Sequence, residues 1–262
     1  MKILNPKVDP ERFFSELSNA SERVLLLDYD GTLAPFHVDW DKALPYDGVR
    51  PRLQKMIASE KLRVVIISGR SISDLIRLLE LEELPEIWGC HGAERLGPNQ
   101  QSQEILLDPG TTEGLEKAAT WSIESGWESA MELKPAGIAF HWRGQPEEKA
   151  RQMRGAIIEG LKEIADKASL QLRDFDGGIE LIAGSVSKAK AVNAVLSEAG
   201  SDLVAAYLGD DKTDEDAFNV MADKGLSVLV RPEFRPTAAD IWLRPPEELL
   251  DFLDQWYSAA GG

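Results

Sequence analysis

The stretch Leu25-Leu26-Leu27-Asp28-Tyr29-Asp30-Gly31-Thr32-Leu33 decides the fold of this 262-residue chain. The apolar run 24–27 predicts a buried strand of a parallel sheet, and Gly31 lets the backbone turn soon after it. Open α/β sheets place their reactive groups at the carboxyl ends of such strands. Asp28 is therefore placed to attack an electrophile, and Asp30 to move a proton. The alternative is a strand end whose acids are solvated in an Asp-Gly turn.

Apolar runs and amphipathic stretches alternate through much of the remaining chain, which is typical of a doubly wound sheet. Further buried strands are predicted at 63–67, 86–90, 203–208 and 226–230, and helices at 71–79 and 246–257. These elements predict an α/β fold with a mostly parallel, Rossmann-like sheet.

The middle of the chain has a different pattern. Helices are predicted at 111–125 and 146–167, and strands at 129–133, 138–142, 170–175 and 179–183. Turn signals join the strands in pairs, so this region forms an α-β-β-α-β-β series. We expect an inserted α+β cap domain at 109–184, and a core domain made of 1–108 and 185–262.

Composition limits the partners and the compartment. The net charge of −16 argues against nucleic acid and anionic membranes as partners, so an anionic substrate needs local cations. No apolar run reaches the length of a membrane span, and the first residues lack a signal-peptide core. A single cysteine, Cys90, fits a reducing compartment, so we expect a cytoplasmic protein. We expect a monomer, although the sequence does not exclude an oligomer.

Polar groups follow four of the predicted strands or begin the helix after them. Ser68 offers a hydroxyl to a phosphate oxygen, although a helix N-cap is an alternative role. Lys188 could neutralise both the phosphate and the nucleophile, although an isolated lysine is more often on the surface. Asp210, Asp211 and Asp214 follow the strand at 203–208. Adjacent aspartates at a buried strand end require a cation, and a set of carboxylates without a His or Cys cluster favours Mg²⁺.

These motifs resemble those of the haloacid-dehalogenase-like phosphatase superfamily. Within it, the chain resembles trehalose-6-phosphate phosphatases over almost its whole length. The segments that carry this likeness are Asp28-Tyr29-Asp30-Gly31-Thr32-Leu33, Ile67-Ser68-Gly69-Arg70, His91-Gly92-Ala93-Glu94, Glu132-Leu133-Lys134, His141-Trp142-Arg143, Gly178-Ile179-Glu180, and the stretch from Gly209-Asp210-Asp211 to Phe218.

The resemblance implies a role for each matching residue. Asp28 would be the nucleophile and Asp30 the general acid/base. Asp28, Asp30 through its carbonyl and Asp210 would hold Mg²⁺, supported by Asp211 and Asp214. The remaining roles are phosphate binding by Ser68, Gly69 and Lys188, and sugar binding by Glu132, Lys134 and Glu180, with Arg143 and His91 as weaker sugar-binding candidates.

The implied function is Mg²⁺-dependent hydrolysis of a sugar phosphate, trehalose 6-phosphate above others, through an aspartyl-phosphate. Ala189 stands where the family usually has glycine after the lysine, and the proline usually found after the position of Glu180 is absent. Both departures affect the expected identity of the sugar more than the expected phosphatase chemistry. The alternatives are a phosphatase for a sucrose, glucosylglycerol or mannosylglycerate phosphate, and a catalytically silent module that binds a sugar phosphate.

Overall fold

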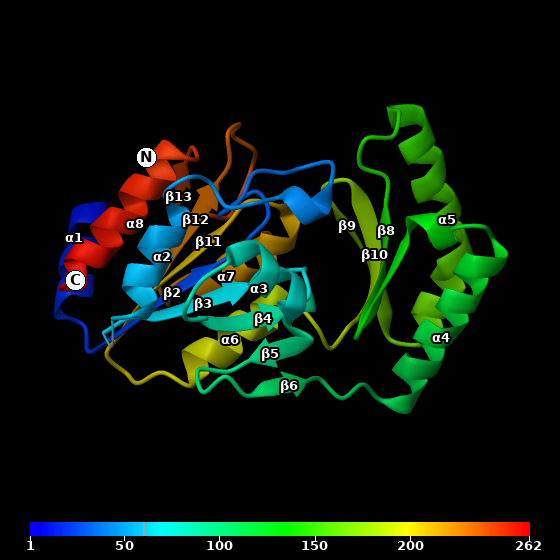
Figure 1. Cartoon of the computed structure of the whole chain (residues 1–262), viewed down its shortest axis with the longest axis horizontal. Coiled ribbons are helices and arrows are strands. Elements are labelled where there is room, and N and C mark those ends of the chain that lie inside the picture. Colours follow the sequence, from blue (N-terminus) through cyan, green and yellow to red (C-terminus); the bar gives the residue numbers. More distant parts are fainter. Residues whose placement is uncertain (60) are drawn as a thin grey trace. The chain divides into compact units, whose positions relative to one another are not determined.

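The computed structural model describes residues 1–59 and 61–262, and the chain divides into two units (Figure 1). The core unit comprises Met1–Gln103 and Lys188–Gly262, and the inserted unit comprises Glu104–Ser187. The expected domain boundaries, 108/109 and 184/185, differ from these by a few residues. The structure confirms the predicted fold class, α/β with a mostly parallel sheet.

A nine-stranded sheet forms the centre of the core unit, in the order β1-β13-β12-β11-β2-β3-β4-β5-β6. The strands from β13 to β4 are parallel, whereas β1 is antiparallel to β13 and β5 is antiparallel to β4. Their bounds are β1 Lys2–Ile3, β2 Glu22–Leu27, β3 Arg63–Ile67, β4 Glu86–Gly89, β5 Glu94–Leu96, β6 Ser102–Glu104, β11 Leu203–Gly209, β12 Leu226–Val230 and β13 Ile241–Leu243.

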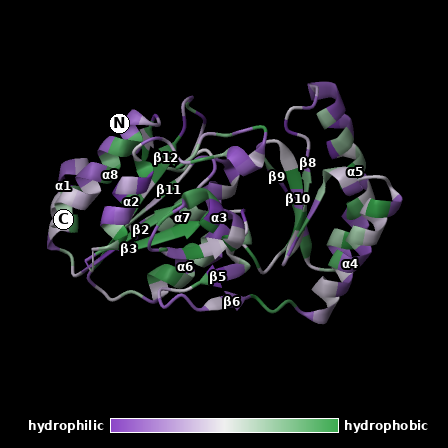
Figure 2. Cartoon of the chain, in the orientation of Figure 1, coloured by the Kyte–Doolittle hydropathy of each residue, from purple (hydrophilic) through white to green (hydrophobic). Residues whose placement is uncertain are grey.

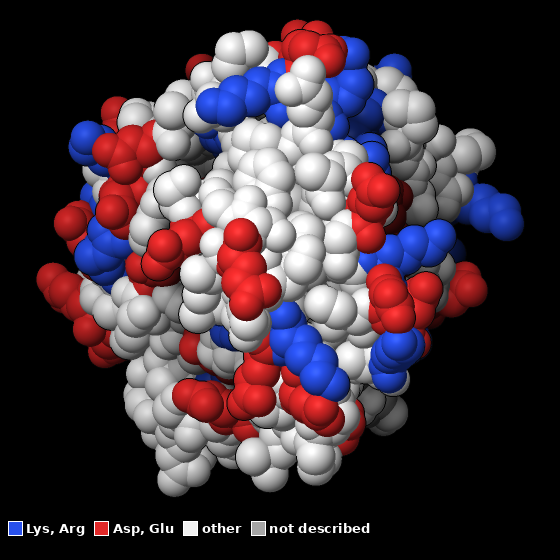
Figure 3. All heavy atoms as spheres, turned by 90° about the vertical axis from the view of Figure 1, so that its right-hand side faces the viewer, with Lys and Arg blue, Asp and Glu red and all other residues white. Residues whose placement is uncertain are grey.

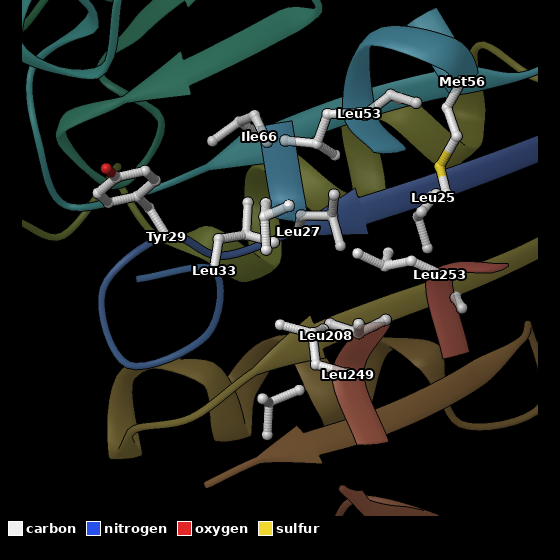
Figure 4. Packing of buried hydrophobic residues seen from close by; sticks show 14 of the residues in the cluster. Leu25, Leu27, Tyr29, Leu33, Leu53, Met56, Ile66, Leu208, Leu249 and Leu253 are labelled. Carbon is white, nitrogen blue, oxygen red and sulfur yellow. The ribbon is translucent and has the colours of Figure 1, made fainter. Parts of the chain in front are cut away.

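Helices cover both faces of this sheet. They are α1 Pro10–Asn19, α2 Val49–Ile57, α3 Ile72–Leu79, α6 Lys188–Ser197, α7 Glu215–Met221 and α8 Glu247–Ala259. One face packs against α1, α2, α3 and α8, with alternate residues of β2 such as Leu25 and Leu27 in the contact (Figure 4). The other face packs against α6 and α7, with Leu26 among its buried residues. Burial on both faces explains why the central strands are almost continuously apolar (Figure 2).

The inserted unit has a four-stranded antiparallel sheet in the order β7-β8-β10-β9, with two helices. Its elements are α4 Pro109–Glu124, β7 Met131–Lys134, β8 Gly137–His141, α5 Glu147–Lys167, β9 Leu170–Phe175 and β10 Gly178–Ala183. Trp121 of α4 lies against Gly160 of α5, where a β-carbon would come within 1.8 Å of the indole. Figure 3 shows acidic and basic side chains interspersed around an uncharged centre. On α5, Lys167 pairs with Glu163.

Short 3₁₀ turns complete the structure: η1 Trp40–Lys42, η2 Cys90–Gly92, η3 Glu128–Ala130 and η4 Lys212–Asp214. The strand predicted at 86–90 ends at Gly89, because Cys90 and His91 adopt positive φ values of 47° and 57°. Within the described part of the chain, no helix is long and apolar enough to span a membrane.

Candidate functional site

Three neighbouring parallel strands of the core unit bring the predicted motifs to one edge of the sheet. The order β11-β2-β3 places Asp210, Asp28 and Ser68 after adjacent strands. Leu27 pairs with Leu208, and the Asp28 N–H donates to the Leu208 carbonyl at 2.9 Å. The parallel sheet therefore assembles residues that lie about 180 positions apart in sequence.

Asp28 is buried and paired. Its Oδ1 accepts a hydrogen bond from Lys188 Nζ at 2.6 Å, and its Oδ2 accepts one from the Thr32 hydroxyl at 3.1 Å. Lys188 Nζ also donates to Asp214 Oδ1 at 2.7 Å. The lysine begins α6, so a helix terminus fixes a buried ammonium between two buried carboxylates.

Asp214 makes contacts with both of its oxygens. Besides Lys188, Oδ1 accepts from the Tyr207 hydroxyl at 2.5 Å, while Oδ2 accepts from the N–H groups of Asp210 and Asp211 at 3.0 and 2.9 Å. Burial opposes its charge, but Lys188 prevails and lowers the pKa of Asp214. Asp214 is thus an ionised acid that shapes the loop after β11.

Asp210 lies in a narrow space beside the first motif. Gly31 has φ +80°, and a β-carbon there would come within 2.2 Å of Asp210 Oδ2. Glycine is required at this position both for the turn and for the close approach of the carboxylate. The loop after β2 and the loop after β11 are therefore in direct contact.

The buried acids repel one another. Burial, and next the charge of Asp28, raises the pKa of Asp210 well above its ordinary value of 3.8. Burial also raises the pKa of Asp28, against the lowering effect of Lys188. For Lys188 itself, burial is outweighed by Asp214 and Asp28, which raise its pKa above 10.5. The single ammonium of Lys188 does not offset the charge of three buried carboxylates, those of Asp28, Asp210 and Asp214.

A divalent cation fits this donor set. Asp28, Asp210 and Asp214, the group found among the described residues, each offer a carboxylate oxygen within 4.8 Å of the others. Because Asp214 already accepts four hydrogen bonds, its oxygens have less capacity left for an ion than those of Asp28 and Asp210. The donors are hard oxygen atoms, and the cluster could hold a metal ion.

Asp30 and Arg70 form a bidentate ion pair. Arg70 donates from Nε and Nη2 to the two oxygens of Asp30, both at 2.6 Å. Its Nη1 donates to the Trp40 carbonyl at 3.0 Å, and its guanidinium lies 5.5 Å from the Tyr29 ring centroid. Arg70 therefore fixes the orientation of Asp30, the predicted acid/base residue. Arg70 belongs to one of the sequence motifs, but the sequence alone assigns it no role.

Ser68, Gly69 and His91 lie together at the end of β3. The Ser68 hydroxyl accepts from the Arg70 N–H at 3.2 Å, and Ser71, not Ser68, caps α3 by accepting from the Asp74 N–H at 3.1 Å. A β-carbon on Gly69 would come within 2.6 Å of His91 Nε2. His91 therefore packs against the proposed phosphate-binding turn within the core unit.

Three predicted sugar-binding residues of the inserted unit, Glu132, Lys134 and Glu180, share one face of its sheet. Glu132, Ala139, Glu180 and Arg173 occupy one row across the four strands. Directly opposed residues lie on the same face, and Lys134 belongs to the next row on that face. Lys134 Nζ lies 3.4 Å from Glu180 Oε1, and Glu180 is 3% exposed.

His141 ends β8, and the predicted sugar ligand Arg143 follows two residues later. His141 Nε2 lies 2.8 Å from Glu132 Oε2, so the histidine pairs with a predicted sugar ligand. Burial opposes ionisation of Glu132, yet this bond and the charge of Lys134 lower its pKa. Arg143 lies beside Gly177 and donates from Nη2 to the Asp176 carbonyl.

The structure adds partners that sequence reasoning missed. Arg70 and Tyr207 could have been suspected, because each lies within three residues of a motif position. Arg235 could not, because nothing local marks it, yet it donates to the carbonyl groups of Asp210 and Asp211.

Acidic strand ends, a central, mostly parallel sheet and an inserted α+β unit define the fold that solved haloacid dehalogenase-like proteins have. A haloacid dehalogenase-like hydrolase from Bacteroides thetaiotaomicron superposes with a TM-score of 0.64 at 17% identity, covering 89% of this chain and 99% of that one. The C-terminal domain of C. albicans trehalose-6-phosphate phosphatase superposes with a TM-score of 0.80 at 21% identity, covering 100% and 99%.

The family follows from the sequence comparisons. The model of the trehalose-phosphatase family matches residues 26–242, and the chain belongs to this family of phosphoric monoester hydrolases. Trehalose-phosphate phosphatase B of Arabidopsis thaliana is 31% identical, over 92% of this chain and 69% of the relative. Probable trehalose-phosphate phosphatase E of the same plant is 29% identical, over 92% and 73%.

Proposed function

We propose that this chain is a Mg²⁺-dependent phosphatase that hydrolyses trehalose 6-phosphate to trehalose and inorganic phosphate. The observation that carries the proposal is the buried Asp28 carboxylate, which lies 2.6 Å from Lys188 Nζ and beside Asp210. The names of the relatives support the choice of sugar.

The reaction proceeds in two steps through a phosphoryl group on Asp28. A carboxylate oxygen of Asp28 bonds to phosphorus, and the bond from phosphorus to the sugar oxygen breaks. The sugar oxygen keeps the electron pair and takes a proton from the protonated Asp30. In the second step, the oxygen of a water molecule bonds to phosphorus while the water gives a proton to Asp30. The bond between phosphorus and the Asp28 oxygen breaks, which frees the Asp28 carboxylate and inorganic phosphate.

Proton transfer requires a change at the ion pair. Both Asp30 oxygens accept from Arg70 in the structure. One of them must exchange its guanidinium contact for the substrate oxygen before the proton moves. Arg70 then retains the other oxygen and keeps the carboxyl group in place.

Ser68, Gly69 and Lys188 bind the phosphate in this proposal. The Ser68 oxygen accepts from the Arg70 N–H, so its own O–H can donate to a phosphate oxygen. The ammonium of Lys188 offsets the charge of the nucleophile as an anionic substrate approaches.

Asp28, the carbonyl of Asp30 and Asp210 would hold Mg²⁺, with Asp211 and Asp214 supporting the loop. Carboxylate and carbonyl oxygens are the ligands that Mg²⁺ prefers. When bound, the ion supplies positive charge that offsets the negative charge of the phosphate oxygens.

The inserted unit supplies the sugar site, which we place on Glu132, Lys134 and Glu180. Ala139 lies between the two glutamates in the row, so a small side chain separates their two strands on this face. Carboxylates and an ammonium offer both acceptors and donors to sugar hydroxyls. Arg143 remains a proposed contributor of this unit, and His91 remains a proposed sugar-binding residue of the core unit.

Phosphate release from a panel of sugar phosphates tests the proposal. We expect trehalose 6-phosphate to give the highest kcat/KM with Mg²⁺, and Asp28→Asn to abolish turnover. Wild-type rates from Asp28→Asn would refute the nucleophile. A higher kcat/KM for sucrose, glucosylglycerol or mannosylglycerate phosphate would make that compound the preferred substrate in place of trehalose 6-phosphate. Failure of the wild type to hydrolyse any aryl phosphate would favour a silent binding module.

A further inference from the structure

Arg235 reaches the loop that carries Asp210 from a distant part of the sequence. Its Nε donates to the Asp210 carbonyl at 3.0 Å, and its Nη2 donates to the Asp211 carbonyl at 2.7 Å. Its Nη1 donates to the Pro236 carbonyl at 3.0 Å and pairs with Glu215, the first residue of α7. The side chain is 17% exposed, so this guanidinium is mostly removed from water.

Asp214 binds the N–H groups of the same two residues, Asp210 and Asp211. Its Oδ2 accepts the N–H groups of Asp210 and Asp211, while Arg235 donates to both of their carbonyl oxygens. All four polar backbone groups of the dipeptide therefore bond to charged side chains. Hydrogen bonds of this kind are stronger than those between neutral groups.

This double clamp fixes the direction of the Asp210 side chain. The peptide planes on either side of a residue determine where its Cα–Cβ bond points, because each plane is rigid. The Asp210 carboxylate also has little room to move, since it lies against the backbone of Gly31. Arg231 Nη1 also reaches the Asp210 carbonyl, at 3.5 Å, but it lies 3.4 Å from the carboxylate oxygen Oδ2 as well, whereas Arg235 donates to the carbonyl groups of Asp210 and Asp211.

We propose that Arg235 is a positioning residue for the metal site, which holds the backbone at 210–211 so that the Asp210 carboxylate points toward Asp28. The inference rests on the proposed function, in which Asp28 and Asp210 are metal ligands. Residues that orient a metal ligand from outside the site typically change metal affinity or activity about 10–100-fold when removed.

Binding of Mn²⁺ alone tests this role without substrate. We would follow the paramagnetic resonance of free Mn²⁺ with the full chain as wild type, Arg235→Met, Arg235→Lys and the control Arg12→Met. We expect Arg235→Met to weaken binding about 10–100-fold. Arg235→Lys should bind at an intermediate level, because one ammonium cannot span two carbonyls as a planar fork does. Arg12 pairs with Glu16 on α1 at a largely exposed position, so its variant should bind as the wild type does.

Activity at rising Mg²⁺ separates positioning from general damage. We expect the Arg235 variants to be impaired at low Mg²⁺ and to recover at saturating Mg²⁺. Unchanged Mn²⁺ affinity, a loss of activity that Mg²⁺ does not relieve, or a wild type that binds no Mn²⁺ would overturn the inference. If Arg235→Met does not fold, Arg235→Lys decides by the same criteria. A wild type that binds Mn²⁺ but leaves trehalose 6-phosphate intact would refute the proposed function, while the affinity series would still judge Arg235.

Discussion

Individual residues in this site differ in how their charge is satisfied. Asp214 accepts four hydrogen bonds, including those from Lys188 and Tyr207, and its pKa is lowered. Asp210 lies in the same buried cluster, but burial and the charge of Asp28 raise its pKa. The contrast shows why one acid organises the loop while the other is suited to bind a cation.

Arg70→Lys is expected to slow proton transfer with little change in substrate binding. A lysine keeps the charge but loses the two-pronged contact that orients Asp30. General acid–base catalysis contributes roughly 10²–10⁴-fold, so misorientation should lower kcat for trehalose 6-phosphate by about 10–100-fold. Steady-state kinetics should show this fall in kcat with KM nearly unchanged.

An aryl phosphate with a very acidic leaving group sharpens this prediction. Such a leaving group needs no proton, so the first step should stay fast and the second should be slow. Stopped-flow measurement should reveal a burst of aryl alcohol close to one equivalent of enzyme. Arg77→Lys is the matched control, because Arg77 also lies near the Trp40 ring but is half exposed. A raised KM with normal kcat would instead assign Arg70 to substrate binding.

At the scale of elements, apolarity determines how well a strand can be predicted from sequence. The strand predicted at 203–208 corresponds to β11, and the one predicted at 226–230 to β12, because both faces of each are buried. The short strands β5 and β6 escaped prediction, since all three residues of β6 are exposed and give no apolar signal. Helix α1 was also missed, although Asp9 as N-cap and Pro10 after it were visible in the sequence.

The site residues that can be predicted from the sequence are also those that lie next to strongly apolar strands. The candidate residues of the core unit stand out in the sequence because most of them come directly after an apolar strand or at the start of a helix. Partners such as Arg235 were beyond reach, because only the packing of the segment after β12 brings that guanidinium to Asp210. In the inserted unit, the sequence suggested Glu132 and Glu180, and the strand register then placed them on one face.

Strand register also leads to a prediction for Glu180→Gln. Glu180 is buried on β10 beside Lys134, so the amide removes a charge from the proposed sugar site. A hydrogen bond to a charged group contributes about 1.5–3 kcal/mol, so KM for trehalose 6-phosphate should rise about tenfold or more. An aryl phosphate has no sugar, so its kcat/KM should stay unchanged in the same assay.

A control on α5 completes this experiment. Glu163 pairs with Lys167 on the exposed side of α5, and Glu163→Gln should behave as the wild type with both substrates. Equal losses with the sugar phosphate and the aryl phosphate would mean that Glu180 supports the fold and not the sugar.

At the scale of the whole molecule, an overall charge of −16 accompanies a buried acidic cluster. The unfolded chain ionises Asp28 and Asp210 near their ordinary pKa of 3.8, but the folded metal-free protein keeps their protons to higher pH. Stability from a carboxylate with a raised pKa is fully present below the unfolded pKa and is lost as the pH rises through the folded pKa. The stability that the lowered pKa of Asp214 contributes is already present above pH 3.8, so it does not cancel this trend.

The thermal midpoint should therefore respond to Mg²⁺ more strongly at about pH 8 than at about pH 5.5. Protons compete with the cation at Asp28 and Asp210, and binding at 100 times the dissociation constant stabilises a folded state by about 2.7 kcal/mol. Differential scanning calorimetry with Mg²⁺ or with a chelator, at both pH values, measures the two shifts. Asp210→Asn should abolish the metal-dependent shift and raise the midpoint of the metal-free protein at the higher pH, because it removes a buried charge. A Mg²⁺ shift that is equal at both pH values, or larger in acid, would mean that the buried carboxylates are not the groups that bind the ion.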